Sequence, residues 1–230
     1  MTAIAKEAKI DIDGLLKSGV HFGFGRSRRH PSVKDYIFGS KNKTDIFDLE
    51  KTSVSLKNAL DFLSKLGEEN QTLLLVGGKN EAREAVKAAG EKMKLPYVAG
   101  RWIGGTLTNF PEVRKRIDRM LDLMAQKKSG ELAKYTKKER LLLDREIAKL
   151  QNYFAGLTPM TALPKAVFVV DARFEATAVR EARKLHIPVV ALCSSDNNVR
   201  DIDYPILGND ASRSSVSHII ELVEKADLRN

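Results

Sequence analysis

The chain has 230 residues, 43% of them hydrophobic, so it is long enough to bury a core and to form one or two domains. Its 39 Lys and Arg residues exceed its 30 Asp and Glu residues, and the formal net charge of +9 favours a polyanionic partner. A single cysteine excludes an internal disulfide, and no apolar run approaches the ~20 residues of a membrane-spanning helix. We expect a cytoplasmic protein without a signal peptide or membrane association.

The first quarter of the chain predicts a short helix, a basic glycine-rich loop and two short strands. The helix is expected over residues 12–18, and the strands over 36–38 and 44–47 with a polar turn between them. Apolar residues at helical spacing then predict a helix over 52–66. We therefore expect a helix and β-hairpin extension ahead of the main fold.

From residue 72 onward, apolar strands alternate with amphipathic helices. Strands are expected over 72–76, 96–99, 166–170, 188–193 and 204–207, and helices over 81–93, 176–185 and 214–225. Nearly continuous apolar strands are typical of a parallel sheet covered on both faces. Five such strands in this order predict an α/β fold with a flavodoxin-like, doubly wound, five-stranded parallel sheet.

Residues 111–154 interrupt this alternation with two long, charged helices. Apolar residues spaced four, three and four apart form one seam in each helix: Val113, Ile117, Met120 and Met124, then Leu143, Ile147, Leu150 and Phe154. Residues 136–139 have the sequence of a capping box that opens the second helix. We expect an antiparallel coiled-coil helical hairpin, inserted into an α/β domain made of residues 1–110 and 155–230. Its many surface cations are by themselves typical of a solvated helix face.

An enzyme would most plausibly use the ends of two predicted strands, residues 77–80 and Asp171. Doubly wound sheets often bind phosphates there, but the glycines match neither the dinucleotide nor the P-loop pattern. An aspartate at a strand end more often caps a helix or pairs with a nearby base. The four histidines and Cys193 lack zinc-motif spacing, and no serine lies in a nucleophile elbow. We expect no enzyme and no cofactor; an α/β nucleotide-binding enzyme, a DNA-binding regulator and a hairpin-mediated interaction protein are the alternatives.

The strongest binding signal is the basic loop, residues 21–43. Its cations and the second of its two histidines are Arg26, Arg28, Arg29, His30, Lys34, Lys41 and Lys43, against the single acid Asp35. Phe22, Phe24, Tyr36 and Phe38 are interleaved with them, a mixture typical of RNA-facing loops. We interpret Phe22, Tyr36 and Phe38 as core residues, which leaves the cations free to bind phosphates.

A second distinctive segment, residues 101–109, contains the only tryptophan of the chain. Arg101 and Trp102 precede Gly104 and Gly105, and the expected hairpin follows. An exposed Trp102 would suit stacking on RNA, whereas a buried one would anchor the hairpin base. We favour the hinge interpretation for Trp102 and keep Arg101 as an RNA-contact hypothesis.

This Arg-Trp-hydrophobic-Gly-Gly segment ahead of a helical hairpin resembles the bacterial small ribosomal subunit protein two family. Residues 15–23, 36–39, 48–52, 136–139, 163–171 and 208–210 resemble further family signatures. The chain departs from the family pattern at Leu207, where proline is common, and around Arg29, where many members have tryptophan.

The resemblance implies a structural component of the small ribosomal subunit that binds small-subunit rRNA and supports subunit assembly and translation. It implies neighbouring small-subunit proteins as partners, with ribosomal protein one as a candidate, and no homo-oligomer. By position, Arg26, Arg28, Arg29, Lys34, Arg101 and Trp102 are the expected RNA contacts, to which charge adds His30, Lys41, Lys43, Arg114 and Lys115. We further expect that charge reversal at Arg26, Arg28 and Arg29 weakens incorporation into the subunit but leaves the protein folded.

Overall fold

The computed structural model describes residues 10–226 and contains a five-stranded parallel sheet in the order β5-β4-β6-β7-β8. The strands are β4 (Leu73–Val76), β5 (Tyr97–Val98), β6 (Ala166–Val170), β7 (Val189–Cys193) and β8 (Tyr204–Leu207). This is the strand order of flavodoxin-like folds, in which the order of strand addition reverses between the parallel neighbours β4 and β6. The predicted fold class is therefore confirmed.

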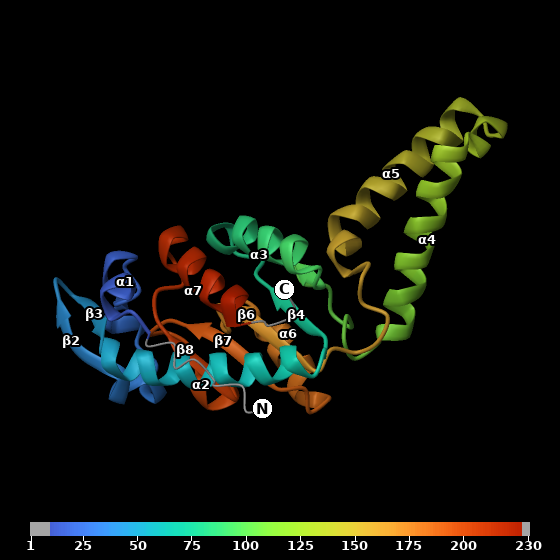
Figure 1. Ribbon diagram of the computed structural model, residues 1–230. Coiled ribbons are helices and arrows are strands. Elements are labelled where there is room, and N and C mark those ends of the chain that lie inside the picture. The colour runs from blue at the N-terminus through green and yellow to red at the C-terminus, as the bar shows by residue number, and fades with distance from the viewer. Residues whose placement is uncertain (1–9, 227–230) are drawn as a thin grey trace.

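Side chains of the sheet alternate between two cores. Leu73, Leu75 and Phe168 belong to the core that is covered by α2 (Leu49–Glu68), α3 (Asn80–Met93) and α7 (Arg213–Ala226), with α1 (Ile12–Lys17) at its margin. Leu74 and Val76 belong to the opposite core, under α6 (Ala176–Lys184) and the base of the hairpin. The sheet is thus sandwiched between helices, as Figure 1 shows, because its strands are apolar on both faces.

The N-terminal extension is a three-stranded antiparallel sheet in the order β1-β3-β2. The predicted strands correspond to β2 (Ile37–Lys41) and β3 (Thr44–Phe47), which are joined by a tight turn with positive φ at Asn42 and Lys43. The expected hairpin is present, and a third strand that the sequence did not reveal, β1 (Phe22–Gly25), pairs with β3 on its other side. The two glycines of its Phe-Gly-Phe-Gly sequence weaken its strand signal, so pairing with β3 decides its conformation.

The inserted segment forms α4 (Phe110–Ser129) and α5 (Lys137–Phe154), which project as a hairpin from the α/β body (Figure 1). The capping box between Thr136 and Glu139 is present as predicted. The first seam was wrong at its last position: Leu123 is buried, whereas Met124 is 39% exposed. An α-helix drifts relative to a 3.5-residue repeat, so the buried row shifts by one residue near the tip.

None of the helices within residues 10–226 combines the length and apolarity required to cross a membrane.

Candidate functional site

The basic loop is fixed to the sheet by the segment that follows β7. The hydroxyl Oγ of Ser195 accepts a hydrogen bond of 2.8 Å from the backbone N–H of Phe24. The carbonyl of Ser195 accepts another, of 2.8 Å, from the backbone N–H of His30. A third bond, of 3.1 Å, runs from the backbone N–H of Val199 to Oγ of Ser32. These bonds give the loop a defined conformation on the surface.

Most cations of the basic loop point outward. Arg26 and Arg28 lie on a short 3-10 helix (Arg26–Arg28), and Lys34 lies on a second one (Pro31–Tyr36). The side chains of Arg26, Lys34, Lys41 and Lys43 are exposed and form no ion pair with any residue between 10 and 226. Arg28 pairs with Asp196 at 3.1 Å but remains 54% exposed. Within residues 10–226, the loop thus presents more positive charge than its acidic partners neutralise.

Arg29 differs from its neighbour Arg28 because its own side chain is only 21% exposed and makes a two-point contact with a fully buried carboxylate. Its Nε and Nη2 donate to Asp45 at 2.6 and 2.5 Å, and Asp45 is fully buried. Hydrogen bonding from the Arg29 guanidinium lowers the pKa of Asp45. The expectation that every cation of this loop is free was therefore wrong for Arg29. Charge reversal there would place two carboxylates in contact, so the triple reversal is not expected to leave the fold intact.

The aromatic residues of the loop are less buried than predicted. Phe22 and Phe38 are 47% and 81% exposed, so their assignment to the core was wrong; Tyr36 is half-buried against it. Both exposed residues lie on β1 or β2, the two edge strands of the small sheet. The ring of Phe24 lies against the guanidinium of Arg28, 4.3 Å from its centroid, and the ammonium of Lys79, 5.5 Å away.

Trp102 is buried between the hairpin base and α6. Its side chain belongs to the core under α6, and its indole Nε1 donates to Glu181 at 3.1 Å. A buried indole has no free face for a base, so this geometry fits the hinge interpretation rather than stacking. The neighbouring Arg101 is exposed.

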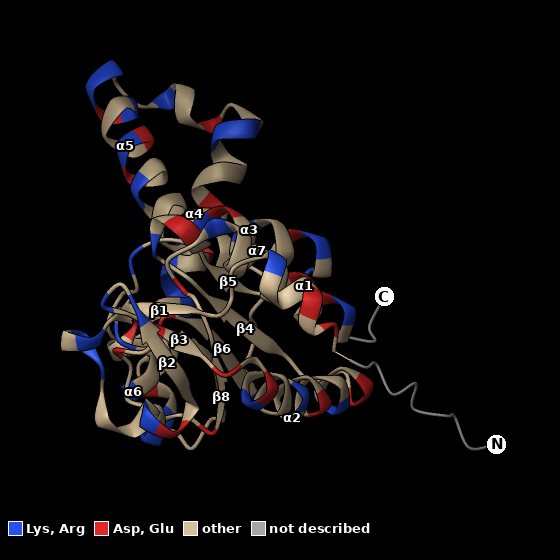
Figure 2. Ribbon diagram, turned by 90° about the vertical axis from the view of Figure 1, so that its left-hand side faces the viewer, with Lys and Arg blue, Asp and Glu red and all other residues tan. Residues whose placement is uncertain are grey.

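The two hairpin residues of the predicted site, Arg114 and Lys115, form ion pairs with nearby acids of their own helix. Arg114 pairs with Asp118 at 2.7 Å and also donates to the carbonyls of Thr158 and Met160. Lys115 pairs with Glu112 at 2.6 Å. The hairpin projects away from the small N-terminal sheet (Figure 1), and the Lys and Arg segments of Figure 2 occur on both parts. The predicted site residues therefore form two separate groups.

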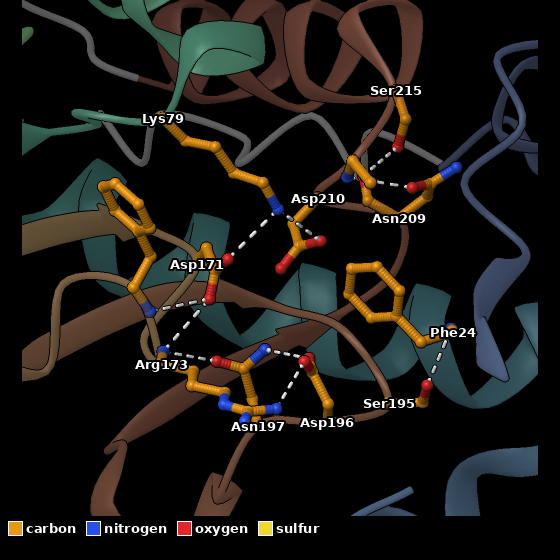
Figure 3. A network of polar contacts seen from close by, with 12 residues as sticks. Phe24, Lys79, Asp171, Arg173, Ser195, Asp196, Asn197, Asn209, Asp210 and Ser215 are labelled. Atoms are coloured by element: carbon orange, nitrogen blue, oxygen red, sulfur yellow. Dashed lines mark hydrogen bonds and ion pairs between the residues drawn. The ribbon is translucent and has the colours of Figure 1, made fainter. Parts of the chain in front are cut away.

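The carboxyl edge of the parallel sheet is filled by an internal polar network (Figure 3). Lys79 Nζ lies 3.1 Å from Asp171 and 3.2 Å from Asp210. Asp171 also accepts hydrogen bonds from the backbone N–H groups of Arg173 and Phe174, which begin the turn into α6. Burial and the nearby charge of Asp171 raise the pKa of Asp210 to about 7. Asp171 thus pairs with the cation Lys79 and holds the turn into α6, as its position after a strand suggested.

This edge is unsuited to phosphate. The backbone N–H of Gly78, two residues before α3, donates to Oε1 of the buried Glu175 at 2.8 Å. A carboxylate therefore already occupies a backbone donor of the turn that leads into that helix. Three clustered metal-binding side chains occur nowhere among residues 10–226. The alternative of a nucleotide site at this edge, which the sequence did not favour, finds no support in this geometry.

Sequence reasoning missed three arginines around α6. Arg173, Arg180 and Arg183 are exposed and line a surface cleft together with Arg28 and Arg29. Their spacing within residues 173–183 was the available signal, but a basic helix face is usually only solvated.

Fold and site together define a flavodoxin-like α/β protein with a basic surface and a projecting hairpin. Residues 15–229 match the family described as "Ribosomal protein S2". The chain is 41% identical over 203 residues to "Small ribosomal subunit protein uS2" of Hahella chejuensis, a match that covers 88% of this chain and 80% of the relative. It is also 41% identical over 212 residues to the protein of that name from Thermus thermophilus, covering 92% and 83% of the two chains.

The chain belongs to the ribosomal protein S2 family. Its role is accordingly that of a structural component of the small ribosomal subunit and not that of an enzyme. The family resemblance expected from the sequence is confirmed.

Proposed function

We propose that this ribosomal protein binds small-subunit rRNA mainly through phosphate contacts from its basic loop. The observation that carries the proposal is a group of four exposed cations that form no ion pair within residues 10–226: Arg26, Lys34, Lys41 and Lys43. They lie on a loop that is hydrogen-bonded to the sheet, so little conformational freedom is lost on binding. Neutralising phosphates releases counterions, which is the dominant source of affinity in such interfaces.

The remaining candidate residues differ in how directly they would contact the RNA. Arg28 and His30 lie next to the four cations, and Arg101 is an exposed contact near the hairpin base. Arg114 and Lys115 would have to exchange their local acidic partners for phosphate. We assign Arg29 and Trp102 roles in supporting the fold and not in RNA contact, because both are held by buried carboxylates. The exposed rings of Phe22 and Phe38 are suited to unpaired bases.

The test compares a triple variant, Arg26→Gln/Lys34→Gln/Lys41→Gln, with the wild-type protein. If about six phosphates are engaged, log affinity for protein-free small-subunit rRNA should fall with log salt at a slope of roughly −4 to −5. The triple variant should flatten that slope by about 2 and reduce incorporation into subunits, while its thermal midpoint stays close to that of the wild type.

The control variant, Lys57→Gln/Lys65→Gln/Lys87→Gln, changes the same charge on α2 and α3, which cover the opposite face of the sheet. It should retain the wild-type slope. An unchanged slope and normal incorporation of the loop variant would contradict the proposal.

We also propose that the hairpin docks neighbouring proteins of the subunit, with ribosomal protein one among the candidates. The exposed side chains of Leu141 and Leu142, 51% and 53% accessible on α5, favour this second function. Subunits that carry Leu141→Ser/Leu142→Ser should lose a neighbouring protein, as measured by quantitative mass spectrometry. An unchanged protein composition would contradict the docking proposal.

A further inference from the structure

A cleft of about 500 Å³ lies between the basic loop and α6. Four of the arginines that line it belong to two distant parts of the chain: Arg28 to the loop, and Arg173, Arg180 and Arg183 to the segment that follows β6. Ala172 and Val179 supply apolar surface to the lining. The cleft exists only because the segment after β7 hydrogen-bonds the basic loop beside α6.

The arginines of this cleft are incompletely neutralised. Arg28 and Arg173 share one nearly buried carboxylate, Asp196, at 3.1 and 2.8 Å. Their side chains remain 54% and 60% exposed, so each guanidinium has donors that face solvent.

The other two arginines add to the excess of charge. Arg183 pairs with Asp201, whereas Arg180 donates to two groups of its own helix, the carbonyl of Ala176 and the hydroxyl of Thr177, and forms no ion pair within the described residues 10–226. These four arginines are therefore matched by two aspartates, Asp196 and Asp201, and the cleft has a net positive charge. Arg29 also lines it, but that guanidinium is neutralised by Asp45.

We infer that this arginine cleft binds the phosphates of an RNA strand, as an extension of the contact made by the basic loop. The inference rests on the proposed rRNA-binding function. Guanidinium groups held in place by Asp196 present planar pairs of donors, which match phosphate oxygens. The apolar lining accommodates a ribose or base between phosphates.

An RNA strand fits the cleft better than an acidic peptide, because Arg28 belongs to both the cleft and the basic loop. A single strand can therefore pass from one to the other with a continuous row of phosphates.

The experiment measures affinity for protein-free small-subunit rRNA as a function of salt, using the full-length protein. Arg173→Gln/Arg180→Gln removes two cations of the cleft. We expect affinity to fall about tenfold or more and the salt slope to flatten by about 1.5. Arg180→Gln alone, whose partners all lie within α6, should give about half of the change in slope without affecting the fold. Lys57→Gln/Lys65→Gln on the opposite face is the charge-matched control.

The outcomes separate this inference from the proposed function. If the cleft variants bind rRNA like the wild type while the basic-loop triple variant is impaired, the cleft inference is wrong and the proposed function stands. If the wild-type protein does not bind rRNA, both fail. If rRNA binding is unchanged but polyglutamate binds the wild-type protein and not the cleft variants, the cleft is a site for an acidic peptide and the inference is overturned.

Discussion

Trp102 and Glu181 join the base of the hairpin to α6 through a buried hydrogen bond of 3.1 Å from the indole Nε1 to Oε1. The same carboxylate accepts hydrogen bonds from the backbone N–H groups of Gly105, Leu107 and Thr108 at 2.8, 3.0 and 3.2 Å. Burial opposes ionisation of Glu181, but these donors together lower the pKa of its carboxyl group. One side chain of α6 therefore holds the turn from which the hairpin begins.

Glu181→Gln should destabilise the protein by about 2–4 kcal/mol, because an amide brings donors toward groups that are themselves donors. Urea unfolding at pH 7 measures this loss, with Glu68→Gln at the exposed end of α2 as the control. The lowered pKa means that the stabilisation is present above the unfolded-state pKa and is lost as pH falls through the folded-state pKa. A cost below about 0.5 kcal/mol, as for an ordinary surface change, would refute the bracing role.

The two glycines of the hinge should differ in their tolerance of alanine. Gly105 has φ +93°, and an added Cβ would lie 3.4 Å from the Cβ of Asn109. Gly104 has no such φ, and its Cβ would meet nothing within 4 Å. Gly105→Ala should therefore cost about 1–2 kcal/mol in the free energy of unfolding, whereas Gly104→Ala should be neutral or slightly stabilising. Equal effects of the two changes would show that the turn is not constrained at Gly105.

Arg29→Gln should lower the free energy of unfolding by about 3 kcal/mol, because it leaves the buried Asp45 without its partner. Arg29→Gln/Asp45→Asn should restore part of that loss by removing the unpaired charge. Arg26→Gln, an exposed change on the same loop, is the matched control and should be near neutral. If Arg29→Gln were as mild as Arg26→Gln, Arg29 would be available for RNA.

Asp210→Asn should change the pH dependence of stability. The pKa of Asp210 is raised to about 7, so between the unfolded-state value and pH 7 the unfolded chain gives up this proton more readily than the folded protein. The contribution of Asp210 is full below its unfolded-state pKa and is lost as pH rises toward 7. Between pH 5 and 7.5, stability of the wild type relative to Asp210→Asn should fall by up to about 3 kcal/mol. Urea denaturation at the two pH values checks this, and a constant difference would contradict the raised pKa.

The periodic parts of the fold were predictable because their residues face a uniform environment. β6 and β7 are apolar along their whole length, and α3 shows its buried row directly in its spacing. The strand β1 was missed because its conformation depends on pairing with β3. The shift from Met124 to Leu123 was missed because a heptad count does not describe the drift of a straight helix.

Prediction of the candidate site was limited by distance along the chain. The basic loop is evident from charge, but Arg29 and Asp45 are 16 residues apart, and Arg28 and Asp196 are 168 apart. Charge counting treats all of these cations alike. Only their partners separate Arg29, which is held by a buried acid, from Arg26, which faces solvent.

By itself, the sequence determined the α/β class, the inserted hairpin, the basic surface and the family, because these depend on residue type and regular spacing. The tertiary structure decided that Trp102 is a buried brace, that Lys79 closes the carboxyl edge between Asp171 and Asp210, and that Arg173 and Arg180 join the basic loop in one cleft. The physical reason is that burial and ion pairing depend on which residues meet in space, and those partners lie far apart in the chain.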